Sequence, residues 1–61
     1  MNVTVINFII NDCDLQCFEK YDIEQNKEFW LNQTYYNFDE RERKYLEKYY
    51  DYRIKNYETK T

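Results

Sequence analysis

Residues 3–20 read VTVINFIINDCDLQCFEK, and this stretch decides which fold the sequence predicts. If Asn11 and Asp12 form a two-residue hairpin loop, each apolar side chain before the loop meets an apolar one after it. Strand side chains alternate with a period of two, so the pairs share one side of the ribbon. The pairs are Ile10 with Cys13, Phe8 with Leu15, and Ile6 with Cys17. The pattern predicts an antiparallel hairpin with strands over residues 2–10 and 13–23.

A third strand is predicted over residues 28–36. The polar residues Glu24, Gln25 and Asn26 suit a short loop in which the asparagine takes the left-handed position. This loop pairs the second strand with the third, and it places Phe29, Leu31 and Tyr35 on the core face of the first hairpin. A helix over residues 24–36 is the alternative. Helix against strand stays open for residues 13–36.

Residues 38–57 have the pattern of an amphipathic helix, with apolar side chains on one broad face. Asn37 and Glu40 have the spacing of a capping box at its start. Two i,i+4 ion pairs are expected along it, in the orientation that favours a helix. They are Glu40 with Lys44 and Asp51 with Lys55.

Together these elements predict a single small α+β domain over residues 1–61. It has a three-stranded antiparallel sheet of two hairpins, one long C-terminal helix packed on one face, and a frayed tail over residues 58–61. A chain of 61 residues buries only about 60% of the surface that its unfolded form exposes. Such a body has no room for a deep cleft.

The composition excludes several kinds of chemistry. The chain has no Gly, Pro, His, Ser or Ala, so neither a glycine-rich phosphate loop nor a Ser–His nucleophile can form. Cys13 and Cys17 lie ~13 Å apart on a strand, too far for a disulfide. They are predicted to be buried thiols without a further ligand for zinc. We expect no catalytic residue, no metal site and no cofactor.

The charge and the hydropathy of the sequence exclude some classes of partner. The sequence contains neither a recognisable secretory leader nor an apolar run of the ~20 residues that span a bilayer, so we expect a cytoplasmic protein. The net charge is −3 and the pI about 4.8. From Asp39 onward, six acids stand against seven bases, which is typical of an ion-paired helix face. Direct nucleic-acid binding is therefore not expected, and neither is binding to a membrane.

Surplus apolar surface gives the functional hypothesis, because one helix covers only one face of a sheet. The other face carries four apolar candidates for partner binding, with Trp30 as the main anchor: Val5, Phe18, Trp30 and Tyr36. Acidic residues gather before Asp39, where six acids stand against two lysines. Four of these acids are candidates to meet a basic groove: Asp14, Asp22, Glu24 and Glu28.

In size and composition the chain resembles the very small proteins that phages and mobile elements encode against host machinery, anti-CRISPR proteins among them. About half of the chain is Asn, Lys, Ile, Tyr or Phe, whose codons are rich in A and T. The resemblance implies a non-enzymatic inhibitor that binds a host nuclease, polymerase or defence effector in the host cytoplasm. The alternative is a homodimeric regulatory protein of the antitoxin type, which buries the same patch against a second copy.

Overall fold

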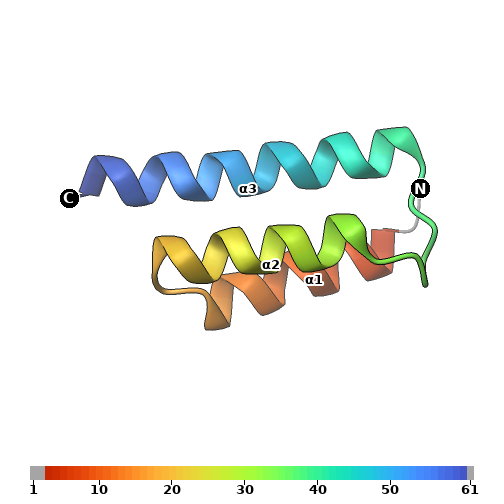
Figure 1. The fold of residues 1–61 in the computed structure, drawn as a ribbon, viewed down its shortest axis with the longest axis horizontal. Coiled ribbons are helices and arrows are strands. Elements are labelled where there is room, and N and C mark those ends of the chain that lie inside the picture. Colours follow the sequence, from red (N-terminus) through yellow and green to blue (C-terminus); the bar gives the residue numbers. More distant parts are fainter. Residues whose placement is uncertain (1–2, 61) are drawn as a thin grey trace.

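The structure, a computed structural model, describes residues 3–60, and within them the chain forms three helices (Figure 1). They are α1 (Val3–Gln16), α2 (Lys20–Asn32) and α3 (Glu40–Lys60). Each helix runs antiparallel to the one before it, so the start of α1 lies at the same end of the bundle as the α2–α3 connection. Residues 3–60 contain no strand. The predicted α+β fold with a three-stranded sheet is therefore wrong.

The stretch that suggested a hairpin is mostly helix α1. Ile6, Ile9 and Cys13 are its buried residues, spaced i, i+3 and i+7 as one helix face requires. β-Branched residues favour a strand, but the propensity difference is at most about 0.7 kcal/mol per residue, and packing of the buried face outweighs it. The predicted loop therefore lies inside α1. The strand over residues 2–10 is wrong, and its first residue lies outside the described part of the chain.

Helix α2 replaces the rest of the predicted sheet. A capping box starts it, in which Asp22 Oδ2 accepts a hydrogen bond from the Glu19 N–H at 3.3 Å. Asn26, expected in a loop, lies in the middle of α2. Its Oδ1 atom accepts a hydrogen bond from the Tyr50 hydroxyl at 2.5 Å. The strands over residues 13–23 and 28–36 are therefore wrong. The alternative, a helix over residues 24–36, gave the right type of element. The helix lies four residues earlier, at Lys20–Asn32.

Helix α3 confirms the prediction of a long C-terminal helix, with a different start. Its capping box is formed by Asp39 and Glu42: the Glu42 N–H donates to Asp39 Oδ1 at 2.8 Å, and the Asp39 N–H donates to Glu42 Oε1 at 3.1 Å. The expected box of Asn37 and Glu40 is wrong. Asn37 has φ 51°, a left-handed conformation that asparagine tolerates better than most residues.

The ion pairs and the end of α3 also test the prediction. The Glu40–Lys44 pair is confirmed at 3.1 Å. Asp51 pairs instead with Lys27 of α2, at 3.3 Å, so it connects two helices. The helix continues to Lys60, so the expected frayed tail is wrong over residues 58–60, and residue 61 lies outside the described part.

All three helices contribute to the core. Eight hydrophobic residues among those described are buried: Ile6, Ile9, Cys13, Cys17, Ile23, Leu31, Leu46 and Tyr50. Tyr50 is fully buried, and its hydrogen bond to Asn26 satisfies the hydroxyl that burial removes from water. The bundle measures 35 × 18 × 18 Å. A body this slender leaves many large apolar side chains at the surface.

Candidate protein-binding surface

Five aromatic rings gather where α2 ends and the connection to α3 runs. We call this group the aromatic cluster: Phe29, Trp30, Tyr35, Tyr36 and Phe38. Trp30 meets Phe29 edge-on, with ring centroids 5.1 Å apart, and Tyr36 at 6.1 Å. Tyr36 stacks on Phe38 at 5.8 Å, and Tyr35 meets Tyr36 edge-on at 5.0 Å. These are the separations at which aromatic pairs attract beyond simple burial.

The cluster has an inner and an outer part. Trp30 and Phe38 are half-buried and pack against the core. Phe29, Tyr35 and Tyr36 are exposed to 63%, 86% and 43%, although each lies against another ring. The inner rings thus fix the position of the outer ones. The arrangement is a preorganised apolar surface, which lowers the ordering cost of binding a partner.

Local backbone geometry places these rings. Gln33 leaves the helix in an extended conformation, and its N–H donates to the Phe29 carbonyl at 3.1 Å. Its side-chain Oε1 accepts a hydrogen bond from the Tyr36 N–H at 3.0 Å. The left-handed residue Asn37 then turns the chain, so that Phe38 meets Tyr36. The end of α2 therefore holds the middle of the connection, at Tyr36, through the side chain of Gln33.

The predicted apolar patch is divided in the structure. Trp30 and Tyr36 are brought together in the aromatic cluster. Val5 is half-buried against the core in the first turns of α1. Phe18 is 73% exposed but lies in the α1–α2 connection, at the opposite end of the bundle (Figure 1). A helix rises ~1.5 Å per residue, so the length of α2 separates it from the cluster by roughly 15–20 Å.

The predicted acidic residues are divided as well. Asp14 is bound by Arg53, at 2.6 Å, and Asp22 is the partner of the N-cap residue Glu19 in the capping box of α2. Glu24 and Glu28 are exposed on α2, and neither pairs with a cation among the side chains that the structure describes. Only these two of the four acids are therefore available to a partner.

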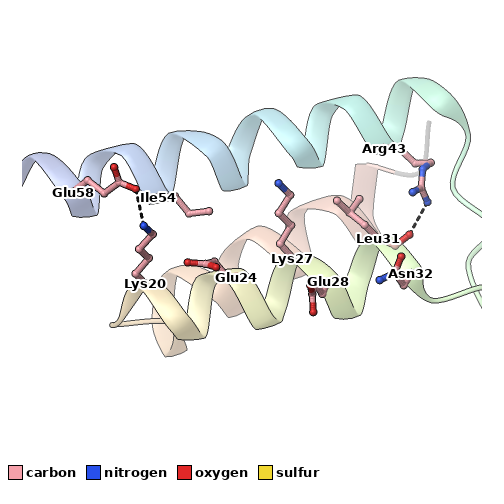
Figure 2. Close-up of a pocket in the computed structure, with 9 residues that line it drawn as sticks. All are labelled: Lys20, Glu24, Lys27, Glu28, Leu31, Asn32, Arg43, Ile54 and Glu58. Carbon is pink, nitrogen blue, oxygen red and sulfur yellow. Dashed lines mark hydrogen bonds and ion pairs between the residues drawn. The ribbon is translucent and has the colours of Figure 1, made fainter.

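A shallow groove of about 520 Å³ lies between α2 and α3 (Figure 2). Lys20 and Glu58 form an ion pair across it at 2.9 Å, and Arg43 Nη1 donates to the Leu31 carbonyl at 2.7 Å. The hydrogen bond to Glu58 raises the pKa of Lys20. Charged residues of both signs line the groove together with Leu31, Asn32 and Ile54: Lys20, Glu24, Lys27, Glu28, Arg43 and Glu58. Such mixed lining fits helix–helix packing and gives no preference for one charge.

Arg53 is the centre of a second polar feature, which we call the Arg53 network. Its Nη1 atom donates to Asp14 Oδ1 at 2.6 Å and to the Tyr49 hydroxyl at 2.8 Å, and Nη2 donates to the Cys17 carbonyl at 2.8 Å. The Tyr49 hydroxyl lies 2.5 Å from Asp14 Oδ1 and 3.2 Å from the Ile10 carbonyl. A cation at the C-terminal end of α1 is also favoured by the helix dipole. These hydrogen bonds connect α1 to α3.

The two cysteines are buried, as predicted, but they are not far apart. The Cys17 N–H donates to the Cys13 carbonyl at 2.9 Å in the last turn of helical backbone, so the separation expected for a strand is wrong. Burial, with the neighbouring Cys13, raises the pKa of the Cys17 thiol from 9.0 to about 12. A thiol that stays protonated is a weak nucleophile. Within residues 3–60, no group of three or more His, Cys, Asp or Glu could hold a metal ion.

Sequence reasoning missed three members of the cluster and the centre of the network. Phe29 and Tyr35 were expected on the core face of a sheet and are exposed, whereas Phe38 was expected to start a helix. The run Tyr-Tyr-Asn-Phe at residues 35–38 carried the available signal, because three rings around one turn-forming asparagine have little room to avoid each other. Arg53 carried no comparable signal, since its partners come from another helix.

Comparisons with known proteins identified no relative of the chain. A scan against family models and searches of curated proteins and of solved structures returned no match. Among residues 3–60, no helix combines the length and the apolar character that a membrane crossing requires.

Proposed function

We propose that the chain is a non-enzymatic protein-binding protein whose aromatic cluster anchors the partner. The observation that carries this proposal is the connected set of five rings, three of them exposed, at one end of a bundle whose core is complete without the outer rings. Tyr and Trp are the residues that most often dominate binding energy at protein interfaces. The half-buried Trp30 supports the outer rings and presents part of its own surface.

The mode of action that we propose is stoichiometric inhibition in the cytosol. The chain offers a small rigid body and a fixed apolar anchor, and the protonated Cys17 is poorly suited to covalent catalysis. Glu24 and Glu28 lie one turn apart on α2, the helix that ends in the cluster. Two carboxylates that pair with no described cation, on the helix that ends in the apolar anchor, suit a partner with a basic groove, such as a nuclease, a polymerase or a defence effector.

The test separates binding from folding. Chains in which the only tryptophan is replaced by fluorotryptophan report on the cluster by fluorine NMR, because Trp30 is unique in the sequence. The partner is captured from lysate of the source cells, identified by mass spectrometry, purified and titrated against the labelled chain. We expect the Trp30 resonance to shift. We also expect Tyr36→Ala to weaken binding about 30-fold, as an anchor residue worth ~2 kcal/mol should.

Tyr21→Ala is the matched control. Tyr21 is a tyrosine exposed to 70%, and it lies near the start of α2, at the opposite end from the cluster. We expect this variant to bind like the unmodified chain. Equal loss in the two variants, or an unchanged affinity in Tyr36→Ala, would contradict the anchor. Phe18→Ala tests whether the partner also reaches the far end.

The runner-up function is a homodimer that buries the cluster against a second copy. The observation in its favour is the large number of exposed apolar residues on α1 and α2, which include Phe8, Leu15 and Phe29. Light scattering across a dilution series distinguishes the two functions. A dimer that Tyr36→Ala dissociates and that captures no other protein would replace the inhibitor.

A further inference from the structure

Helix α3 carries a stripe of cations and tyrosines on the side that faces away from the bundle. We call it the α3 stripe, and its members are Arg41, Tyr45, Lys48, Tyr52 and Lys55. All five are exposed, Tyr45 to 48% and Tyr52 to 62%. At about 100° per residue they fall within an arc of about 80°. Tyr50, which is fully buried, points to the opposite side.

The acids of α3 lie outside this arc, and most are held by other groups. Asp51 pairs with Lys27 at 3.3 Å and Glu58 with Lys20 at 2.9 Å, so both are directed toward α2. Glu42 caps the helix. Glu40 pairs with Lys44 at the edge of the stripe. The α2–α3 packing therefore draws negative charge away from the stripe.

The three cations of the stripe have no such partner. Arg41, Lys48 and Lys55 form no ion pair with the side chains that the structure describes. A hollow at the N-terminal end of the stripe is lined by Asp39, Glu40, Arg41, Lys44, Tyr45 and Lys48. An acidic chain of net charge −3 thus presents one surface of the opposite sign.

The spacing within the stripe indicates the shape of its partner. The five positions follow one another at intervals of four, three, four and three residues, which average 3.5. This is the repeat that keeps a seam facing a second helix along a coiled coil. The tyrosines take one of the two alternating positions and the cations take the other. The fourteen helical steps from Arg41 to Lys55 make the stripe about 21 Å long, or about four turns of helix.

We propose that the α3 stripe docks an amphipathic helix of another protein, with acidic side chains opposite Arg41, Lys48 and Lys55 and apolar ones opposite the two tyrosines. Charge complementarity selects this occupant. A second copy of the stripe would bring like charges together. Binding in a lipid surface needs a broad apolar face beside the cations, and the stripe offers only two tyrosines. A nucleic acid, which carries charge far beyond the stripe, would meet the negative potential of the rest of the chain.

The α3 stripe is independent of the aromatic cluster, because the cluster lies on other elements. Binding to the stripe is followed by the backbone amides of α3, whereas binding to the cluster is followed by the Trp30 signal. Two synthetic helical peptides test it by NMR of the isotope-labelled chain. One peptide carries glutamate and leucine at the two alternating facing positions, and the other has glutamine in place of each glutamate. We expect the acidic peptide to shift backbone amides along α3, with the Trp30 signal unchanged. The glutamine peptide should bind at least about tenfold more weakly.

Matched variants show whether the stripe itself is responsible. Lys48→Gln with Lys55→Gln should weaken binding of the acidic peptide about tenfold, since two of the three cations of the stripe are lost. Asn11→Glu with Gln25→Glu changes the net charge by the same amount on exposed positions of α1 and α2, and it should change affinity less than about twofold. An acidic peptide that shifts no α3 amide, or equal effects of the two double variants, would overturn the proposal. Tighter binding of oligothymidylate than of the peptide would assign the stripe to nucleic acid instead.

Discussion

The Arg53 network and the aromatic cluster both contain tyrosines. The tyrosine of the network connects two helices, whereas the outer tyrosines of the cluster are exposed. In the network, the Tyr49 ring lies under the Arg53 guanidinium at 5.9 Å, and its hydroxyl is bonded to groups of α1. In the cluster, the hydroxyls of Tyr35 and Tyr36 form no hydrogen bond with the residues that the structure describes, and their rings contact other rings. The network connects two helices, whereas the outer cluster connects only residues of one connection and the helix end beside it.

This difference indicates where binding energy is available. Groups that satisfy one another across a helix interface contribute to the free energy of folding, and a partner gains nothing from them. Exposed rings that half-buried rings hold in place contribute little to the free energy of folding, but a partner can cover them at low cost. Substitutions in the network should therefore change stability, and substitutions in the outer cluster should change binding.

The largest effect is expected for Arg53→Met, which keeps the aliphatic stem and removes the guanidinium. Asp14, Tyr49 and the Cys17 carbonyl all lose their donor. Because Arg53 is largely buried and Asp14 is half exposed, we expect a loss of about 2–3 kcal/mol in the free energy of unfolding. Urea unfolding followed by circular dichroism measures it. Arg53→Lys retains the charge without the two-nitrogen fork and should lie between. A loss below ~0.5 kcal/mol for the methionine variant would mean that the network is not a stabilising contact.

Alkaline pH should have a second, smaller effect on the free energy of unfolding, through the buried thiol and tyrosines. Burial raises the pKa of Cys17 from 9.0 to about 12, and burial also raises the pKa values of Tyr49 and Tyr50 above 10.0. The unfolded chain therefore releases these protons at lower pH than the folded chain. The stabilising contribution of Cys17 is complete below pH 9 and decreases between pH 9 and 12, by about 1.4 kcal/mol per unit.

The measurement is the free energy of unfolding at pH 8 and pH 10 in the presence of a reductant. We expect the folded state to lose about 1.4 kcal/mol at pH 10 through Cys17 alone, and more with the two tyrosines. Cys17→Ala removes the thiol contribution and should flatten the profile between these values. An identical decrease in the alanine variant would show that Cys17 does not stay protonated in the folded state.

How far the sequence predicts this molecule differs between its two halves. The broad apolar face and the Glu40–Lys44 pair predict α3, because both depend on residues close together in the chain. The cap was expected two residues too early, and Asp51 pairs with Lys27 of another helix instead of with Lys55. Over α1 the apolar residues fit a period of two and a helical period at once: Ile6, Ile9 and Cys13 lie on one helix face, yet the same stretch also pairs across Asn11 and Asp12. Only the other two helices, which cover that face, decide between the two.

The candidate surface shows the same difference between residues that are close together in the chain and residues that are far apart. Trp30 and Tyr36 are six residues apart, and local chain geometry brings their rings together although the predicted fold is wrong. Their role in binding a partner stays a prediction. Phe18 and Val5 were joined to them only by a sheet register that does not exist. The role of Asp14 could not be predicted, because its partner Arg53 follows 39 residues later.

The smallest effect on stability is expected for Tyr35→Ala, and it is the sharpest test of the comparison. Among the residues that the structure describes, Tyr35 is the most exposed of the large hydrophobic ones, at 86%, and its ring contacts only that of Tyr36. Surface substitutions of this kind change the free energy of unfolding by less than about 0.5 kcal/mol. Urea unfolding of Tyr35→Ala beside Arg53→Met measures both regions on one scale. If the Tyr35 variant lost as much stability as the Arg53 variant, the outer rings would be part of the folding core, and the separation between a folding region and a binding region would not hold.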